Sequence, residues 1–159
     1  MIARAEPLGT AAEARLAYAR AGLRVCHVMS ADLWAGAEVQ VATTASYLMA
    51  QSEVTLTAVL LNEGKLAREL RSLGVEIAVV DEHRHSAAGI LAFLTRFLKI
   101  HQVDIVHTHR YKDTVLGIAA AKLAGVGHVV RTVHGLTEPM RGWDRIKFQA
   151  YDALDKSSL

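Results

Sequence analysis

Disulfide-forming cysteine pairs, long apolar runs and long basic tracts are all missing from this sequence. The single cysteine, Cys26, cannot form an intrachain disulfide, and its place in an apolar run indicates a buried, unreactive thiol and a reducing compartment. No apolar stretch reaches the roughly 18 residues that a membrane-spanning helix needs. Residues 1–23 are rich in Ala and Arg without a continuous apolar core, so we do not expect a secretory signal there.

The composition predicts one compact domain. With 159 residues, of which 52% are hydrophobic and 21% charged, the chain is long enough for one core and too short for two ordinary domains. The net charge of +2 does not indicate nucleic acid as a partner. We expect residues 1–23 to be an extension with a helix over 11–21, residues 24–140 to be the domain, and residues 141–159 to be a C-terminal helix.

Short apolar runs alternate with longer segments of helical spacing, the pattern of βαβ units. The predicted strands are residues 24–29, 54–61, 75–80, 104–107 and 128–133. The predicted helices cover about 36–51, 66–73, 86–101 and 114–124, with Asp113 as N-cap of the last and Gly74 and Gly125 ending two of them. We therefore predict an α/β, Rossmann-like fold: a mostly parallel sheet of about five or more strands, with helices on both faces.

In such sheets ligands bind at the carboxyl ends of the strands, near a switch in strand order. After the first strand, Gly36 and Ala37 open a helix whose N–H groups and dipole suit a phosphate. The alternative is a plain tight turn, in which Glu38 merely complements the helix dipole.

Histidines follow the fourth and fifth predicted strands. Strand alternation places His107 and His109 on one face if the strand continues as far as His109, and a metal site there would need a third ligand that no recognised spacing supplies. The alternative is one buried, hydrogen-bonded histidine and one exposed. His134 and Gly135 suit a ligand-facing turn or, equally, a simple turn that ends the strand.

The order of these motifs resembles family 4 of the retaining glycosyltransferases. The resemblance rests on Trp34-Ala35-Gly36-Ala37-Glu38, on Val103-Asp104-Ile105-Val106-His107-Thr108-His109, and on Thr132-Val133-His134-Gly135, and it covers about residues 24–155. It implies the N-terminal, acceptor-side half of a GT-B fold. By resemblance, His109 is the catalytic residue, Gly36 and Ala37 bind the donor diphosphate, and the substrate cleft is lined by Glu38, His107, Arg110, His134 and Gly135. Ala35 stands where the family commonly has glycine.

The resemblance also implies the reaction and its partners. A sugar would move from a nucleotide sugar to an acceptor hydroxyl, on a glycan or a lipid-linked molecule, with retention and without a cofactor or an essential metal. The family's donor-binding half carries two glutamates eight positions apart, and no glutamates in this chain have that separation. We therefore expect a chain truncated before the donor-binding domain, inactive alone, that pairs with that domain or self-associates.

Three questions stay open at this point. The chain could instead be a non-catalytic subunit that pairs with a separate donor domain, or part of another GT-B enzyme such as a nucleotide-sugar epimerase. The helix over 141–159 carries Trp143 among basic residues, so it either docks onto a domain or touches an anionic membrane. We expect a cytoplasmic protein, with contact at the inner membrane face left open.

Overall fold

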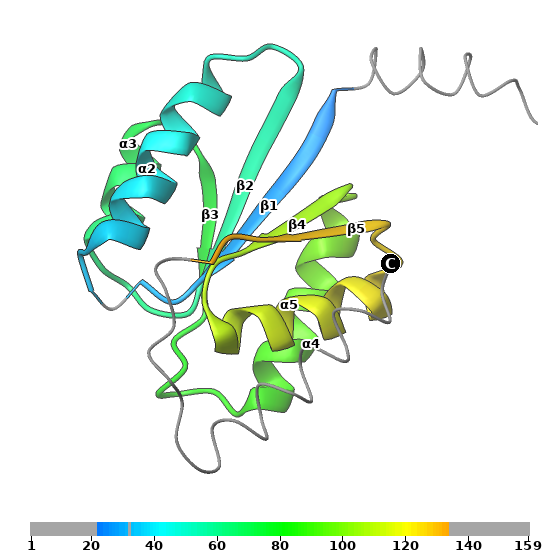
Figure 1. Cartoon of the computed structure of the whole chain (residues 1–159). Coiled ribbons are helices and arrows are strands. Elements are labelled where there is room, and N and C mark those ends of the chain that lie inside the picture. Colours follow the sequence, from blue (N-terminus) through cyan, green and yellow to red (C-terminus); the bar gives the residue numbers. More distant parts are fainter. Residues whose placement is uncertain (1–21, 32, 134–159) are drawn as a thin grey trace, which may run out of the picture.

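The computed structural model describes residues 22–31 and 33–133, which form one parallel sheet between two layers of helices (Figure 1). The five strands lie in the order β3-β2-β1-β4-β5, and each neighbouring pair is parallel. The elements in chain order are β1 Leu23–Met29, α2 Gly36–Met49, β2 Val54–Leu60, α3 Lys65–Ser72, β3 Glu76–Val79, α4 Ala87–Ile100, β4 Ile105–Thr108, α5 Tyr111–Ala124 and β5 His128–Arg131. The predicted fold class is confirmed.

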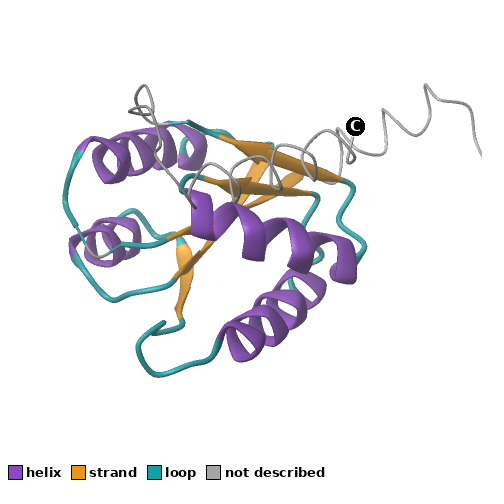
Figure 2. Ribbon diagram, turned by 60° about the horizontal axis from the view of Figure 1, so that its bottom comes forward, coloured by secondary structure: helices purple, strands orange, loops and turns teal. Residues whose placement is uncertain are grey.

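Helices cover both faces of the sheet because side chains of a strand alternate between its faces (Figure 2). On β1, Val25 and Met29 pack in a cluster with residues of α2 and α3, whereas Cys26 and Val28 pack in a cluster with residues of α4 and α5. Leu94 of α4 is fully buried in the cluster that contains Cys26 and Val28. Burial of a side chain of this size contributes roughly 1.5–3 kcal/mol relative to leaving it exposed.

Glycine ends two helices, as predicted. Gly74 follows α3 with a φ of +78°, and Gly125 follows α5 with a φ of +79°, a left-handed conformation that costs glycine little. The predicted helix over 86–101 is also confirmed, since α4 spans Ala87–Ile100 and the Ser86 side chain accepts a hydrogen bond from the Gly89 N–H. Local sequence signals therefore located these ends to within one or two residues.

The predicted N-cap role of Asp113 is wrong. Helix α5 begins at Tyr111, three positions earlier than expected, and Arg110 is its N-cap residue. Asp113 lies in the first turn, fully buried, and its carboxylate accepts hydrogen bonds from the Ser30 N–H at 3.0 Å and the Ser30 hydroxyl at 2.8 Å. These two donors come from the segment after β1, so a distant partner takes the place of the local cap.

Two parts of the predicted organisation lie outside the described residues: the helix over 11–21 and the helix over 141–159. Among the helices that the structure describes, none combines the length and the apolar character that crossing a membrane requires.

Candidate functional site

The strand order changes direction between β1 and β4. Strands β2 and β3 extend the sheet on one side of β1, and β4 and β5 extend it on the other. Adjacent parallel strands whose connections leave in opposite directions create a crevice at their carboxyl ends, where ligands bind in open α/β sheets. The segments after Met29 and Thr108 lie at the edge of the sheet where this crevice is expected, and both contain predicted site residues.

The start of α2 opens toward solvent beside the crevice. Gly36 is exposed, and a Cβ placed on it would have no atom within 4 Å. Its φ is not among the positive values, so neither packing nor backbone conformation requires glycine there. The first N–H groups of a helix have no partner inside the helix. Gly36 and Ala37 therefore present donors that an anion could approach without meeting a side chain.

Glu38 lies fully buried at this helix start. One carboxylate oxygen accepts a hydrogen bond from the Ala35 N–H at 3.0 Å, and the other accepts one from the Arg110 guanidinium. Its role therefore goes beyond complementing the helix dipole, because it ties the start of α2 to the start of α5. The side chain of Arg110 is 32% exposed, and the residue lies at the start of α5, just after the carboxyl end of β4.

Three imidazole rings gather at the carboxyl ends of β1 and β4. Strand β4 ends at Thr108, one residue before His109, so strand alternation does not place this pair. The rings of His107 and His109 nevertheless lie together, and His27 joins them because it is the register partner of His107 across the β1–β4 pair. The His27 Nδ1 and His109 Nε2 atoms share a hydrogen bond of 2.8 Å. The centroid of the His107 ring lies 4.6 Å from that of His27 and 4.3 Å from that of His109.

Neither histidine of the predicted pair is exposed. His109 is buried, and half-buried His107 shares a 2.8 Å hydrogen bond between its Nε2 and the Thr132 Oγ1 atom. The alternative of one buried and one exposed histidine is therefore wrong, since Thr132, just after β5, is the partner of His107 and His27 of β1 is the partner of His109. His83 and His85, by contrast, are exposed in the loop after β3.

The sequence reasoning missed His27. It lies inside an apolar strand about eighty positions before the pair, so no local spacing links it to them. The available signal was a histidine within an otherwise apolar run, together with a parallel sheet that would place this strand beside the fourth one. Burial, followed by the charge of His107, lowers the pKa of His27 to about 3, so its ring is neutral at physiological pH.

A metal ion would find three imidazole nitrogens within 4.8 Å of one another here. Ligand nitrogens about 2.0–2.1 Å from a tetrahedral zinc lie about 3.3–3.4 Å apart. The His27 and His109 nitrogens are closer than that, at 2.8 Å, which is a hydrogen-bond distance. The geometry as it stands therefore suits a hydrogen-bonded pair rather than two ligands of one metal.

The first turn of α5 is held from several sides. Asp113 bonds to Ser30 after β1, and Lys112 forms an ion pair with Glu82 after β3. Glu82 also accepts a hydrogen bond of 3.0 Å from the Asn62 side chain after β2. The ion pair with Lys112 is the main reason why the pKa of Glu82 is lowered. These contacts fix α5 at the strand ends, and sequence reasoning assigned none of them.

Two predicted site residues, His134 and Gly135, lie outside the described residues.

The predicted burial of Cys26 is confirmed. Burial raises the pKa of its thiol to about 12, as expected of an unreactive thiol.

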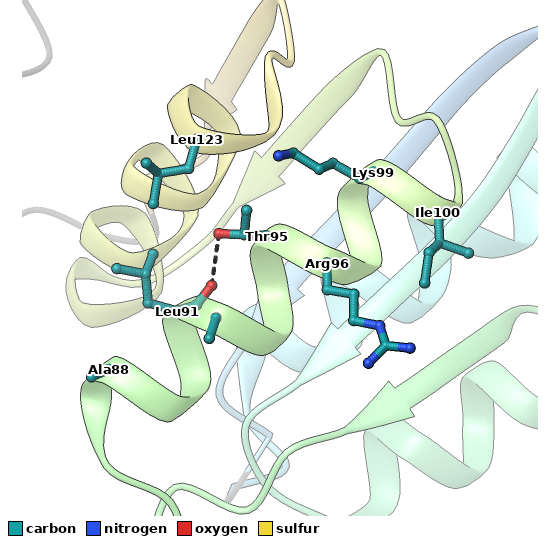
Figure 3. A pocket seen from close by; sticks show the side chains of 8 residues that line it. Ala88, Leu91, Thr95, Arg96, Lys99, Ile100 and Leu123 are labelled. Carbon is teal, nitrogen blue, oxygen red and sulfur yellow. Dashed lines mark hydrogen bonds between the residues drawn. The ribbon is translucent and has the colours of Figure 1, made fainter.

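A groove of about 770 Å³ lies between α4 and α5 (Figure 3). Leu91, Arg96 and Ile100 of α4 and Leu123 of α5 are among its lining residues. None of the predicted site residues lines it. It is therefore separate from the crevice at the strand ends.

Known proteins resemble the chain in both sequence and structure. It is 56% identical over 45 residues to the UDP-Gal:alpha-D-GlcNAc-diphosphoundecaprenol alpha-1,3-galactosyltransferase of Escherichia coli, a match that covers 28% of this chain and 12% of that protein. Among solved structures, a glycosyltransferase from Rickettsia africae has a TM-score of 0.63 and 20% identity, covering 79% of this chain and 33% of that one. A UDP-N-acetylglucosamine 2-epimerase has a TM-score of 0.60 and 19% identity, covering 83% of this chain and 40% of that one.

These solved structures support the GT-B architecture, and the chain spans well under half the length of each relative. The sequence profile of Glycosyltransferase Family 4 matches residues 34–157, which include all the predicted site residues. The start of α2, the pair His107 and His109, and the motif at the end of β5 all fall within that match, and on this evidence the chain belongs to Glycosyltransferase Family 4.

Proposed function

We propose that this chain forms the acceptor-side half of the cleft of a retaining glycosyltransferase. In the complete enzyme, a sugar would pass from a nucleotide-sugar donor to an acceptor hydroxyl. The observation that carries the proposal is the contact between Glu38, in the first turn of α2, and Arg110, which follows His109 at the switch point of the sheet. Glu38 and Arg110 lie 72 positions apart in the sequence. The contact brings N–H donors that suit an anion, a guanidinium and an imidazole to the same edge of the sheet.

Gly36 and Ala37 would receive the diphosphate of the donor. A leaving diphosphate needs hydrogen-bond donors and positive charge, and both a helix start and a nearby guanidinium provide them. The open space above Gly36 supports this role, because a ligand could approach the backbone there without meeting a side chain. Glu38 would act indirectly, by holding Arg110 at the crevice.

His109 would contact the transferred sugar, with His107 beside it. A neutral imidazole has one protonated nitrogen, which can donate a hydrogen bond to the oxygen of a sugar hydroxyl. His134 and Gly135 would line the same cleft. We propose that the reaction needs no cofactor and no essential metal, since the diphosphate would be stabilised by N–H groups and Arg110.

The acceptor is proposed to be a lipid-linked glycan. The relative from Escherichia coli is named for a diphosphoundecaprenol acceptor and a UDP-galactose donor, and 45 residues of this chain share its sequence at 56% identity. An acceptor of that kind would place the enzyme in the cytoplasm at the inner membrane face. The donor-binding half of the cleft would come from a further domain.

An epimerase is the second candidate, because the fold also resembles a UDP-N-acetylglucosamine 2-epimerase. The two are separated by an assay of the full natural polypeptide with nucleotide sugars, with and without lipid-linked acceptors. Sugar transfer that requires an acceptor, and that His109→Ala reduces at least about 100-fold, supports the proposal. Epimerisation without an acceptor would establish the second candidate, and transfer unaffected by His109→Ala would refute the assigned site.

A further inference from the structure

The hydrogen bond between His27 and His109 links a buried strand residue to the histidine that we assign to the sugar. We propose that His27 is a positioning residue that fixes the ring orientation and tautomer of His109: Nδ1–H of His27 donates to Nε2 of His109, which leaves the proton of His109 on its Nδ1 atom. The assignment of His109 to the sugar rests on the proposed function. The assignment of the His109 tautomer is independent of that function.

The geometry defines the kind of contact. The two ring planes lie 9° from parallel with centroids 5.0 Å apart, while the nearest nitrogens are 2.8 Å apart. Rings stacked face to face would have closer centroids than this, so the two imidazoles meet edge to edge with the hydrogen bond in the common plane. Both residues are buried, with His27 1% and His109 6% exposed, so water does not compete for the bond.

The direction of the bond follows from the other nitrogen of His27. Its Nε2 atom is buried and has no hydrogen-bond partner. A neutral imidazole carries one proton, and the ring of His27 is neutral because burial disfavours its charged form. A proton on Nε2 would leave a buried N–H unsatisfied, which is rarer and costlier than a bare lone pair. The proton therefore belongs on Nδ1, and His27 donates.

The consequence for His109 is a defined role. With its Nε2 lone pair occupied by His27, the ring of His109 carries its proton on Nδ1, so any hydrogen bond that this ring donates comes from Nδ1. A partner that orients one imidazole nitrogen decides which nitrogen does the chemistry. His107 has a hydrogen-bond partner of its own, the Thr132 hydroxyl at 2.8 Å.

The experiment measures the ¹⁵N chemical shifts of the imidazole nitrogens in this chain, since protonated and bare nitrogens give well-separated signals. Wild type is expected to show His27 and His109 as Nδ1–H tautomers. His27→Phe keeps a ring of similar size without nitrogens and is expected to abolish the preference of His109 for one tautomer. His27→Asn, whose amide nitrogen takes about the place of Nδ1, is expected to restore it. The matched control is His128→Gln, an exposed histidine on β5.

Several outcomes would overturn the proposal. A His109 proton on Nε2 in wild type would do so without any variant, and so would an unchanged tautomer in a folded His27→Phe protein. Stoichiometric binding of zinc that shifts all three rings would identify a metal centre instead.

Activity of the full natural polypeptide tests separately whether the positioning of His109 by His27 matters for the reaction. His27→Phe is expected to lower kcat about 10- to 100-fold with little change in KM, because a misplaced group loses transition-state contact, and His27→Asn is expected to recover most of it. If the tautomers are as stated but His109→Ala leaves transfer unchanged, the proposed function fails and the tautomer assignment stands. If His109→Ala abolishes transfer while His27→Phe does not alter kcat, the positioning role fails and the function stands.

Discussion

Arg110 donates a hydrogen bond to the carboxylate of Glu38, which is fully buried, from a guanidinium that is 32% exposed. The two residues lie 72 positions apart and begin different helices. The contact therefore joins the two segments that border the crevice, and it holds a positive charge beside the open start of α2. Its disruption should affect both folding stability and function.

Arg110→Met should destabilise the protein by about 2–3 kcal/mol, less than the about 3–5 kcal/mol of a fully buried pair because the guanidinium is partly exposed. The cause is the buried charge left on Glu38. Urea unfolding measures the change, and Glu38→Gln in the same chain should recover part of it. Arg71→Met breaks the exposed pair with Glu63 and serves as control, with an expected change below about 1 kcal/mol. Equal losses of unfolding free energy in Arg110→Met and Arg71→Met would contradict this account.

Gly36→Ala should leave the stability of the fold unchanged or raise it by up to about 1 kcal/mol, because nothing lies within 4 Å of the added Cβ. Binding of the donor diphosphate should nevertheless weaken, as seen in the KM of the full natural polypeptide for nucleotide sugar. The contrasting variant is Gly64→Ala, whose Cβ would lie 2.3 Å from the Ala31 carbonyl oxygen and should destabilise the fold. A Gly36→Ala enzyme with normal donor kinetics would remove Gly36 from the site.

Stability should fall as the pH is lowered below about 6.5. The pKa of His27 is about 3 in the folded protein against 6.5 as its ordinary value, so the unfolded chain binds the extra proton between these pH values. The free energy of unfolding therefore rises with pH across this window, with a slope from this one group of up to about 1.4 kcal/mol per pH unit. Urea unfolding at several pH values measures the slope, which His27→Asn should reduce and His128→Gln should not. An equal slope in His27→Asn would show that other groups cause it.

Cys26 should resist alkylation in the folded protein. Its side chain is fully buried, and burial raises the thiol pKa to about 12, so almost no thiolate forms at pH 8. Iodoacetamide followed by mass spectrometry should detect modification only after unfolding in denaturant. Rapid modification under native conditions would mean that this core opens far more readily than its packing implies.

The purified 159-residue chain should transfer no sugar on its own, because the donor-binding half of the cleft is proposed to come from a further domain. The measurement is incubation with radiolabelled nucleotide sugars and lipid-linked acceptors, with the full natural polypeptide as positive control. The intact mass of the protein from its native source shows whether these 159 residues and the proposed donor-binding domain occur on one chain. Appreciable transfer by the isolated chain would overturn the expectation.

The order of strands and helices was determined by the sequence alone. Apolar periodicity and helix-ending glycines act within a few residues, so the strand over 24–29, the helix over 86–101 and the turn at Gly74 could be predicted from local pattern. The meeting of His107 and His109 could not be predicted in the same way, because β4 ends at Thr108 and alternation within the strand does not extend to His109.

Only the tertiary structure decided which side chains meet. His27 reaches His109 across 82 positions, and Asp113 bonds to Ser30 across 83 positions instead of capping its own helix. These pairings depend on β1 lying next to β4 and on their register, which places His27 opposite His107. Strand order and register result from packing both faces of the whole sheet, and no local segment contains that information.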